Sequence, residues 1–495
     1  MNELIYETKT LKEELLRKVL ERFSPEEFDF IKRALEFAEE MHKGQKRMNG
    51  EDYINHPIRT ALNLISLYLD KETISAALLH DILEDTNVSL EYLESLFGKE
   101  VSFIVDGVTK ITSIKYQNKT IKELQKLSKF LIYLLDDLRV LFVKLSDRLD
   151  NMRTLDFLPE EKRIKVAQET KEIYLPFAQK LGFYLWASEL DELCFKHLYP
   201  DKYKFIKEYI KEKISQGEEI LRDVKERIIK EMTKHGIVPV KVEYRVKKIS
   251  SIWKKYKKKK DLDKIYDIFA LRIIVKKVEE CYLVLGVVHK IFRPIFEEFD
   301  DYIAFPKQNG YQSIHTTVVD KNGQFIEIQI RTEEMHLYNE IGPAAYFGYS
   351  QFKDTKDYLK GKSVIVSESD LKIIEKLRKW QEIKNPKEFL SLIKEEFFQE
   401  KILVYTPKGD IVDLVKGATC VDFAYEIHTE IGNHCAGAIV NGRIVSLDTE
   451  LRNGDVVEII VNKNKFPSRD WLSFVKTYKA RRAIRKFFNE TKKSS

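Results

Sequence analysis

The segment TISAALLHDILEDT (73–86) decides the fold of the N-terminal part of the chain. Its apolar residues recur at helical spacing and are interrupted by His80, Asp81, Glu84 and Asp85. Carboxylates buried beside Leu and Ile are costly unless a cation or hydrogen bonds compensate them. On one continuous helix, His80 would lie a turn from Glu84 and Asp81 a turn from Asp85. We therefore expect potential metal ligands beside potential acid/base carboxylates.

Two further apolar helical segments supply candidates of the same kind. His56 lies in YINHPIRTAL and Asp147 in VLFVKLSDRLDNMRTL. Together with His80 and Asp81 they form a nitrogen and oxygen shell suited to a first-row divalent ion, which does not distinguish manganese, iron and zinc. We interpret the pattern as a metal-dependent hydrolase site, with a purely structural role for these residues as the alternative.

The periodicity divides the chain into several domains. Up to about residue 200 it is helical, and a charged amphipathic helix follows. Beyond residue 237 short segments rich in β-branched residues predict a mixed sheet with helices between the strands. The expected strands include ALRIIV (270–275), HTTVV (315–319) and FIEIQI (325–330). We expect an all-α domain over 1–200, a helical linker over 201–236, an α+β domain over 237–395, a small strand-rich domain over 400–463 and a basic helical region over 464–495.

The composition of the 495 residues indicates a folded globular protein, because 43% are hydrophobic and 12% aromatic. No apolar run reaches eighteen residues and the N-terminus lacks a signal-peptide pattern, so we expect a cytoplasmic protein with no membrane partner. The four cysteines are scattered without C-x-x-C spacing, which favours buried small hydrophobes over disulfides or a zinc ribbon.

The formal charge of +6 conceals two basic segments. Residues 241–260 hold ten Lys or Arg and one Glu, and residues 463–495 hold eleven and two, so the rest of the chain is acidic. Arg245, Lys247 and Lys255 surround a predicted helix start and could converge on a polyphosphate. Residues 257–260 are better explained as a solvated lysine face.

The predicted strand FIEIQIR places Glu327, Gln329 and Arg331 on one face. Asp267, in KIYDIFALR, could join Glu327 in holding Mg²⁺ and activating a hydroxyl. Tyr311, in the loop PKQNGYQSIHT, is a candidate for stacking on a nucleobase. The ending Gly-Lys-Ser at 361–363 is not a P-loop, because Lys356 occupies the position of its first glycine.

The segments HKGQKR, YINHP, ALLHDILEDT, DGVTK and KLSDRLDNMRTL resemble the HD hydrolase domain of bifunctional RelA/SpoT (Rel) enzymes, which make and break the alarmone (p)ppGpp. The resemblance implies that His56, His80, Asp81 and Asp147 bind Mn²⁺, that Glu84 and Asp85 activate water or protonate the leaving group, and that Arg47 and Asn151 hold the nucleotide. Two residues depart from the family pattern, Met48 in place of Lys and Asp150 in place of His, and either could alter substrate affinity.

The segments YDIFALR, DDYIAFPKQNGYQSIHTTV and IEIQIRTEEMH resemble the Rel synthetase domain, which implies a nucleotidyltransferase-like fold and transfer of pyrophosphate from ATP to the 3′-hydroxyl of GDP or GTP. The implied ATP contacts are Arg245, Lys247, Ser251 and Lys255. Asp267 and Glu327 would hold Mg²⁺, with Glu327 as the base. The implied guanine nucleotide pocket comprises Lys307, Asn309, Tyr311, His315 and Gln329.

Two further segments, both in this second domain, depart from the family pattern. The acidic Glu298-Phe299-Asp300-Asp301 replaces a basic R-x-K-D of bifunctional members, which predicts a preference for GDP over the more highly charged GTP. Tyr346 and Phe347 replace a His-Trp pair, without a predicted effect.

The segment from VYTPKGDIVDLVKG to DVVEIIV resembles a TGS domain, which implies a small β-grasp fold that senses uncharged tRNA on the ribosome. His428 matches a position implicated in tRNA contact, with helix capping as its alternative role. The basic tail suits RNA phosphates. The resemblance implies a (p)ppGpp synthetase and hydrolase. The alternatives are an enzyme with one active half and a ribosome or tRNA sensor with vestigial catalytic domains.

Overall fold

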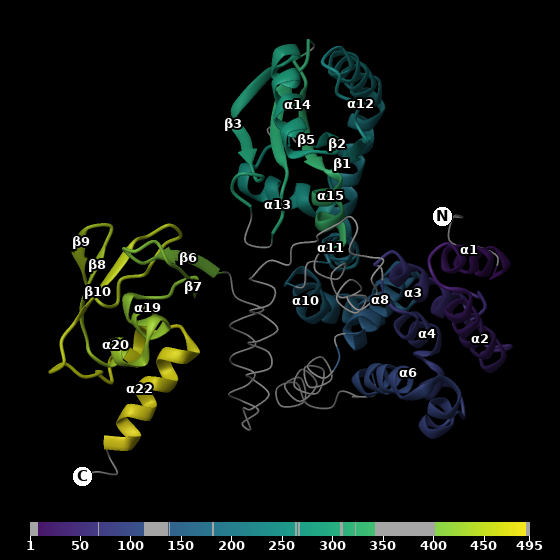
Figure 1. Cartoon of the computed structure of the whole chain (residues 1–495), viewed down its shortest axis with the longest axis horizontal. Coiled ribbons are helices and arrows are strands. Elements are labelled where there is room, and N and C mark those ends of the chain that lie inside the picture. Colours follow the sequence, from purple (N-terminus) through teal and green to yellow (C-terminus); the bar gives the residue numbers. More distant parts are fainter. Residues whose placement is uncertain are drawn as a thin grey trace. The chain divides into compact units, whose positions relative to one another are not determined.

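The computed structural model describes residues 8–67, 69–112, 137, 139–180, 183–262, 265, 268–306, 310–321, 323–341 and 401–491. These residues fall into two compact units, one ending at 341 and one covering 401–491. The first contains a helical domain and a sheet domain, and the second is a smaller strand-rich domain (Figure 1). The multidomain organisation expected from the periodicity is confirmed.

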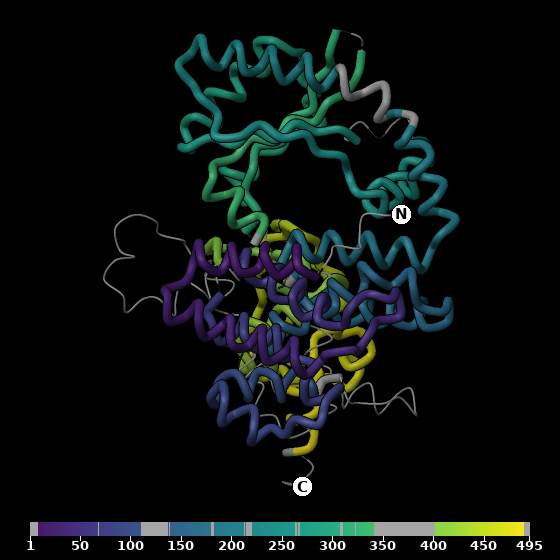
Figure 2. Tube along the Cα trace, turned by 90° about the vertical axis from the view of Figure 1, so that its right-hand side faces the viewer, coloured from purple at the N-terminus to yellow at the C-terminus, as the bar shows by residue number. Residues whose placement is uncertain are grey.

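Helices make up most of the N-terminal domain, and Figure 2 shows its purple and blue helices side by side. Its helices are α1 (Thr8–Leu20), α2 (Pro25–Met41), α3 (Asn55–Ile65), α4 (Lys71–Leu79), α5 (Ile82–Asp85), α6 (Leu90–Thr112), α8 (Arg139–Arg153), α9 (Glu160–Glu169), α10 (Leu175–Lys180) and α11 (Tyr184–Leu198). Local sequence sets several boundaries: Ser24 and Glu27 form a capping box at the start of α2, and Asp70 caps α4.

Helix α8 is largely buried in the interior of this domain. It packs against α3, α4, α6 and α11. Its buried side chains include the charged Lys144, Asp147 and Asp150. A helix with apolar neighbours on most sides normally excludes charges, so three on one helix indicate that this domain is built around a polar site.

Helix α12 (Pro200–Lys234) leads from the helical domain to the sheet, as the sequence predicts. Its second half contributes Leu221, Val224, Ile228 and Met232 to the core of the sheet domain. The long charged helix is therefore a structural wall of the sheet domain as well as a connector (Figure 1).

The sheet domain has the mixed sheet that strand periodicity predicts. Its strands are β1 (Lys241–Val246), β2 (Phe269–Val275), β3 (Arg293–Asp301), β4 (Ile314–Val319) and β5 (Phe325–Thr332). They are ordered β1-β2-β5-β4-β3, with β2 and β5 parallel and the other pairs antiparallel. The accompanying helices are α13 (Ile249–Lys259), α14 (Val278–Ile291) and α15 (Glu333–Ile341).

The two faces of this sheet differ in chemistry. Ile326, Ile328 and Ile330 join the apolar core with residues of α12 and α14. Because side chains alternate along a strand, Glu327, Gln329 and Arg331 lie on the opposite face, as predicted. The polar face is thus separated from the core by the sheet itself.

The second unit contains a hairpin, a three-stranded sheet and four helices among its described residues. The elements are β6 (Lys401–Tyr405), β7 (Ile411–Val415), α19 (Cys420–Ile427), α20 (Thr429–Asn433), β8 (Cys435–Val440), β9 (Arg443–Val445), β10 (Val457–Val461), α21 (Trp471–Phe474) and α22 (Tyr478–Thr491). A parallel bridge between Tyr405 and Val456 links the hairpin to the strands ordered β10-β8-β9. Strands packed against α19 agree with the expected small β-grasp domain.

The basic C-terminal segment packs against this domain. Asp422 of α19 is buried and accepts hydrogen bonds from the backbone amides of Thr419, Lys476 and Thr477 and from the Thr419 and Thr477 hydroxyls. Trp471, Val475 and residues of α22 add a second apolar cluster. One buried carboxylate therefore ties the start of α19 to the chain that precedes α22.

All four cysteines are buried and none forms a disulfide, at positions 194, 281, 420 and 435, as the cysteine spacing predicts. Among the residues described, no helix is both long and apolar enough to span a bilayer.

Candidate active sites

The helical domain brings its candidate metal ligands together from three places in the chain. His56 lies in the first turn of α3, His80 follows the end of α4, and Asp147 lies in α8. The expected continuous helix through residues 73–86 is not found, because α4 ends at Leu79 and α5 begins at Ile82. The backbone amides of Glu84 and Asp85 both donate to the Asp81 carbonyl. His80 and Asp81 therefore sit at a junction between two helices.

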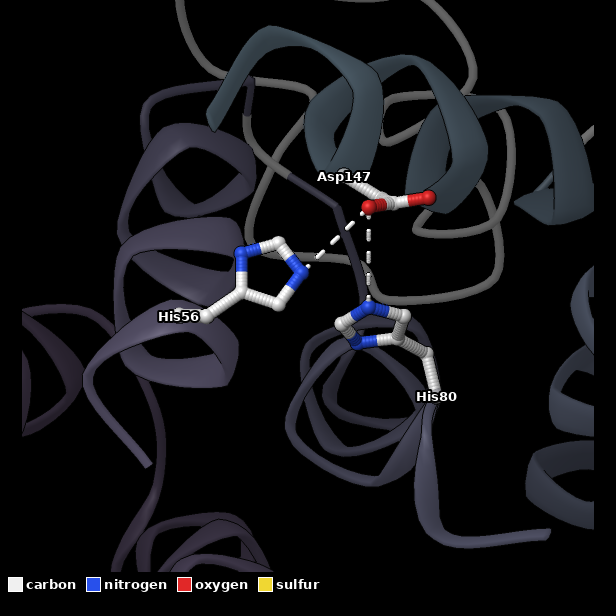
Figure 3. Close-up of side chains that lie close together, drawn as sticks. All are labelled: His56, His80 and Asp147. Carbon is white, nitrogen blue, oxygen red and sulfur yellow. Dashed lines mark ion pairs between the residues drawn. The ribbon is translucent and has the colours of Figure 1, made fainter. Parts of the chain in front are cut away.

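Figure 3 shows His56, His80 and Asp147 converging. Their candidate ligand atoms all lie within 4.8 Å of one another. Asp147 Oδ1 is 3.3 Å from His56 Nε2 and 3.9 Å from His80 Nε2. Asp81 Oδ2 approaches the same two nitrogens, at 3.6 Å and 3.2 Å. The four residues predicted as ligands thus surround one small volume.

The hydrogen bonding around His80 fits a divalent cation. Its Nδ1 lies 2.8 Å from the Ala77 carbonyl oxygen, so this nitrogen carries a proton and donates. Its Nε2 is buried and has no hydrogen-bond partner within the described part of the chain. A buried polar atom is costly to leave unsatisfied, whereas a cation beside it would use its lone pair.

Electrostatics around Asp147 lead to the same conclusion. Its Oδ2 accepts a 2.7 Å hydrogen bond from the buried Lys144 Nζ, which leaves Oδ1 to face the histidines. Burial alone would raise the pKa of Asp147, but Lys144, His56 and His80 hold it well below its usual range. Burial alone would lower the pKa of His80, yet Asp81 and Asp147 raise it to about 9. The carboxylates thus attract positive charge, which a divalent ion would supply.

A cavity of about 470 Å³ opens beside this cluster. Its lining includes Arg47 and Asn151, both predicted to hold a nucleotide, and Glu84 and Asp85. Arg47 Nη2 donates to Asn151 Oδ1 at 2.5 Å, so the two form one wall. Met48 also lines the cavity.

The sheet domain joins its predicted site residues in one chain of contacts. Arg245 donates to Gln329 Oε1 at 3.3 Å, and Gln329 donates to Glu327 Oε2 at 3.1 Å. His315 Nδ1 lies 2.9 Å from Glu327 Oε1, and its Nε2 lies 2.7 Å from the Tyr311 hydroxyl oxygen. Strand register explains the meeting, because His315 lies opposite Gln329 in the β4–β5 pair.

A glycine determines how Tyr311 enters this site. Gly310 has φ +75°, and a Cβ there would lie 2.5 Å from the Tyr338 hydroxyl oxygen. Only glycine therefore fits the backbone directly before Tyr311.

Three family models match three separate regions of the chain. An HD domain matches residues 34–184, the region found in RelA/SpoT proteins matches 244–354, and a TGS domain matches 402–461. The chain is 47% identical over 480 residues to a guanosine-3′,5′-bis(diphosphate) 3′-pyrophosphohydrolase of Aquifex aeolicus (strain VF5), covering 97% of this chain and 67% of the relative. The chain belongs to the RelA/SpoT family.

Other members carry the name of the opposite activity. A GTP pyrophosphokinase of Myxococcus xanthus is 41% identical over 471 residues, which make up 94% of this chain and 61% of that protein. The chain thus spans about two thirds or less of these two relatives. A solved small alarmone synthetase 1 of Bacillus subtilis, bound to pppGpp, shares 24% identity, covers 35% of this chain and 97% of its own, and has a TM-score of 0.24.

The structure describes some of the remaining candidate residues of the synthetase site and leaves others outside the described ranges. Ser251 and Lys255 lie on α13, and Lys247 directly follows β1. Asp267, Lys307 and Asn309 lie outside the described residues, as do Tyr346 and Phe347.

Helix α13 is held by the helical domain. Its N-cap residue, Lys248, makes no capping hydrogen bond through its side chain. Instead, Glu192 of α11 accepts from the backbone amides of Ile249 and Ser250, at 3.2 Å and 2.9 Å. Asp191 accepts from the Ser250 hydroxyl and from Lys254 Nζ. The helix that carries Ser251 and Lys255 is therefore positioned by α11.

The structure adds two arginines to the polar face of the sheet. Arg272 pairs in register with Gln329, so the two side chains share a face. Arg331 is 1% exposed, and its Nε and Nη2 have no hydrogen-bond acceptor among the described residues. Burial, followed by the charge of Arg272, lowers the pKa of Arg331 to about 10. The alternation of side chains along the sequence predicted that Arg331 lies on this face but assigned it no role. It overlooked Arg272, although the strand ALRIIV has the same two-residue period.

The acidic segment Glu298-Phe299-Asp300-Asp301, which departs from the family pattern, makes several separate contacts. Glu298 lies 3.6 Å from Lys259 Nζ. Asp301 accepts from the backbone amides of Ile303 and Ala304, which stabilises the turn after β3. Asp300 pairs in register with His315 and so shares its face of the sheet. Among these three acidic residues, Asp300 is therefore the one that pairs directly with a residue of the predicted acceptor pocket.

In the TGS domain, His428 caps a helix, which was the predicted alternative to a contact with tRNA. Its Nδ1 accepts a 3.3 Å hydrogen bond from the Glu430 backbone amide at the start of α20. The residue is exposed, so capping leaves part of its ring at the surface.

Proposed function

We propose that this chain both synthesises and hydrolyses (p)ppGpp at two separate sites. It transfers pyrophosphate from ATP to the 3′-hydroxyl of GDP or GTP with release of AMP, and it hydrolyses the 3′-pyrophosphate with Mn²⁺. The carrying observation is that one chain contains both a buried His/Asp cluster beside a cavity and a hydrogen-bonded Glu327 on a polar sheet face. Relatives named for each activity support the same proposal.

In the hydrolase site, His56, His80, Asp81 and Asp147 would hold Mn²⁺. A bound divalent ion offsets charge on the phosphate oxygens and activates water. Arg47 and Asn151 would hold the nucleotide in the cavity that they line. Glu84 and Asp85, which line the same cavity, would accept the proton from water or donate one to the leaving group.

The hydroxyl of Tyr53 adds to the organisation of these carboxylates. It lies 2.9 Å from Asp81 Oδ2 and 2.6 Å from Asp85 Oδ2. Since one hydroxyl has one proton, it can donate to only one carboxylate at a time. Tyr53 would thus hold a proposed metal ligand and a proposed acid/base group at a fixed separation.

In the synthetase site, Glu327 would accept the proton of the acceptor 3′-hydroxyl and, with Asp267, hold Mg²⁺. His315 and Gln329 contact the two oxygens of Glu327 and would fix its orientation. The residues proposed to contact ATP are Arg245, Lys247, Ser251 and Lys255. The guanine nucleotide would lie against Tyr311, His315 and Gln329, with Lys307 and Asn309.

The alternatives differ in what they require of these sites. If only one half of the chain were active, the contacts at either the hydrolase site or the synthetase site would have no catalytic role. A ribosome or tRNA sensor with vestigial catalysis would not need the buried charges of the HD domain, whose cost a bound cation would offset. We propose the TGS domain and the basic α22 as contacts for the ribosome and uncharged tRNA in addition to catalysis.

Nucleotide assays of the purified chain test the proposal. With ATP, GDP and Mg²⁺ we expect AMP and ppGpp in equal amounts. With ppGpp and Mn²⁺ we expect GDP and pyrophosphate, and chelation should stop this reaction. Failure of one reaction, at every divalent ion concentration tried, would leave the alternative with one active half, and failure of both would leave the sensor alternative.

A further inference from the structure

Asp150 is a buried carboxylate in contact with a proposed metal ligand. It lies on α8, three residues after Asp147, and its side chain is 0% exposed. Its Oδ2 is 2.6 Å from His56 Nδ1. This is the position at which the HD resemblance expects histidine.

The contact decides which nitrogen of His56 is available. A carboxylate beside Nδ1 keeps the proton there, so the lone pair remains on Nε2. That Nε2 faces Asp147 Oδ1 at 3.3 Å and Asp81 Oδ2 at 3.6 Å. Asp150 therefore selects the tautomer whose free nitrogen points to the cluster.

Asp150 is itself held by two arginines. Arg59 Nε donates to its Oδ1 at 2.6 Å, and Arg47 Nη1 donates to its Oδ2 at 3.1 Å. Arg59 also donates to both carboxylate oxygens of the buried Glu51, at 2.6 Å and 2.9 Å. Asp150 thus joins a metal ligand to Arg47, which lines the cavity.

We propose that Asp150 is a positioning residue of the hydrolase site: its carboxylate fixes His56 with Nε2 directed at a divalent ion and anchors Arg47 at the cavity wall. This proposal rests on the proposed hydrolase function. A second residue of the same network, Glu51, provides a matched comparison, because its carboxylate binds Arg59, whereas the Asp150 carboxylate binds Arg59 and also His56.

The test is Mn²⁺ binding to the metal-free full chain by calorimetry, with wild type, Asp150→Asn, Asp150→Ala and Glu51→Gln. Loss of a hydrogen-bond partner behind a metal ligand weakens metal binding about 10- to 100-fold. We expect that loss for Asp150→Ala and a smaller one for Asp150→Asn, which keeps an acceptor for Nδ1–H. Glu51→Gln should bind Mn²⁺ within about two-fold of wild type, because it leaves the His56 contact intact.

Helical content and thermal unfolding, followed by circular dichroism, serve as the folding check for each variant. If Asp150→Ala does not fold, the test is the comparison of Mn²⁺ affinity among wild type, Asp150→Asn and Glu51→Gln. Unchanged Mn²⁺ affinity in a folded Asp150 variant, with a wild type that hydrolyses ppGpp, overturns this proposal alone. A comparable loss in Glu51→Gln also overturns it, since the effect would then come from the network in general. A wild type that neither binds Mn²⁺ nor hydrolyses ppGpp overturns the hydrolase function and this proposal together.

Discussion

Replacement of Glu192 by alanine should weaken ATP binding at the synthetase site without touching that site. The Glu192 carboxylate accepts hydrogen bonds from the first two backbone amides of α13, Ile249 and Ser250. Because Lys248 provides no side-chain cap, these amides would lose their acceptor. Loss of such a cap costs about 1–2 kcal/mol. The helix start would then fray where Ser251 and Lys255 are proposed to hold polyphosphate.

The expected effect follows from that magnitude. If the whole cost falls on ATP binding, the KM for ATP rises about 5- to 30-fold, since about 1.4 kcal/mol corresponds to tenfold. The assay is the initial rate of AMP formation at saturating GDP over a range of ATP concentrations. Lys196→Ala is the control, because this residue lies on the same helix but pairs with Asp156. A KM for ATP within two-fold of wild type in Glu192→Ala would refute the role assigned to α11.

Three further predictions concern other parts of the chain. Asp422→Ala should lower the unfolding free energy of the TGS unit by about 3 kcal/mol or more, because buried amide donors lose their acceptor; thermal unfolding followed by calorimetry measures it. His336 has its pKa lowered to about 4 by burial and by Arg331, so the folded state resists its protonation. Stability should therefore fall as the pH drops from about 6.5 toward 4, and His336→Gln should reduce this slope in denaturant titrations. Rates of synthesis with GDP should exceed those with GTP, and Glu298→Arg combined with Asp300→Lys should narrow the difference; a wild type that prefers GTP contradicts this.

Strand periodicity predicted the sheet well, because it reports directly on which side chains are buried. The segment 325–330 alternates strictly, and in the structure its isoleucines enter the core while Glu327 and Gln329 face away. The same reasoning predicts that neighbouring strands share a polar face, but it does not give strand order. The meeting of His315 with Glu327 depends on that order and became visible only in the structure.

The members of the candidate metal cluster were predictable from the sequence, but its detailed geometry was not. Histidine and aspartate within apolar helices indicate a polar site wherever they occur. The break between α4 and α5 was missed, because the residues from Leu79 to Ile82 carry no glycine or proline to signal it. The contact between His56 and Asp150 joins residues 94 positions apart, a distance that spacing along one chain does not encode.

Separation of the two activities by single substitutions tests the central claim most directly. Purified Glu327→Gln and His80→Ala are assayed for ppGpp synthesis from ATP and GDP, and for Mn²⁺-dependent pyrophosphate release from ppGpp. The two-site account predicts that Glu327→Gln abolishes synthesis and retains hydrolysis, and that His80→Ala does the reverse. Loss of both activities in either folded variant would contradict separate sites.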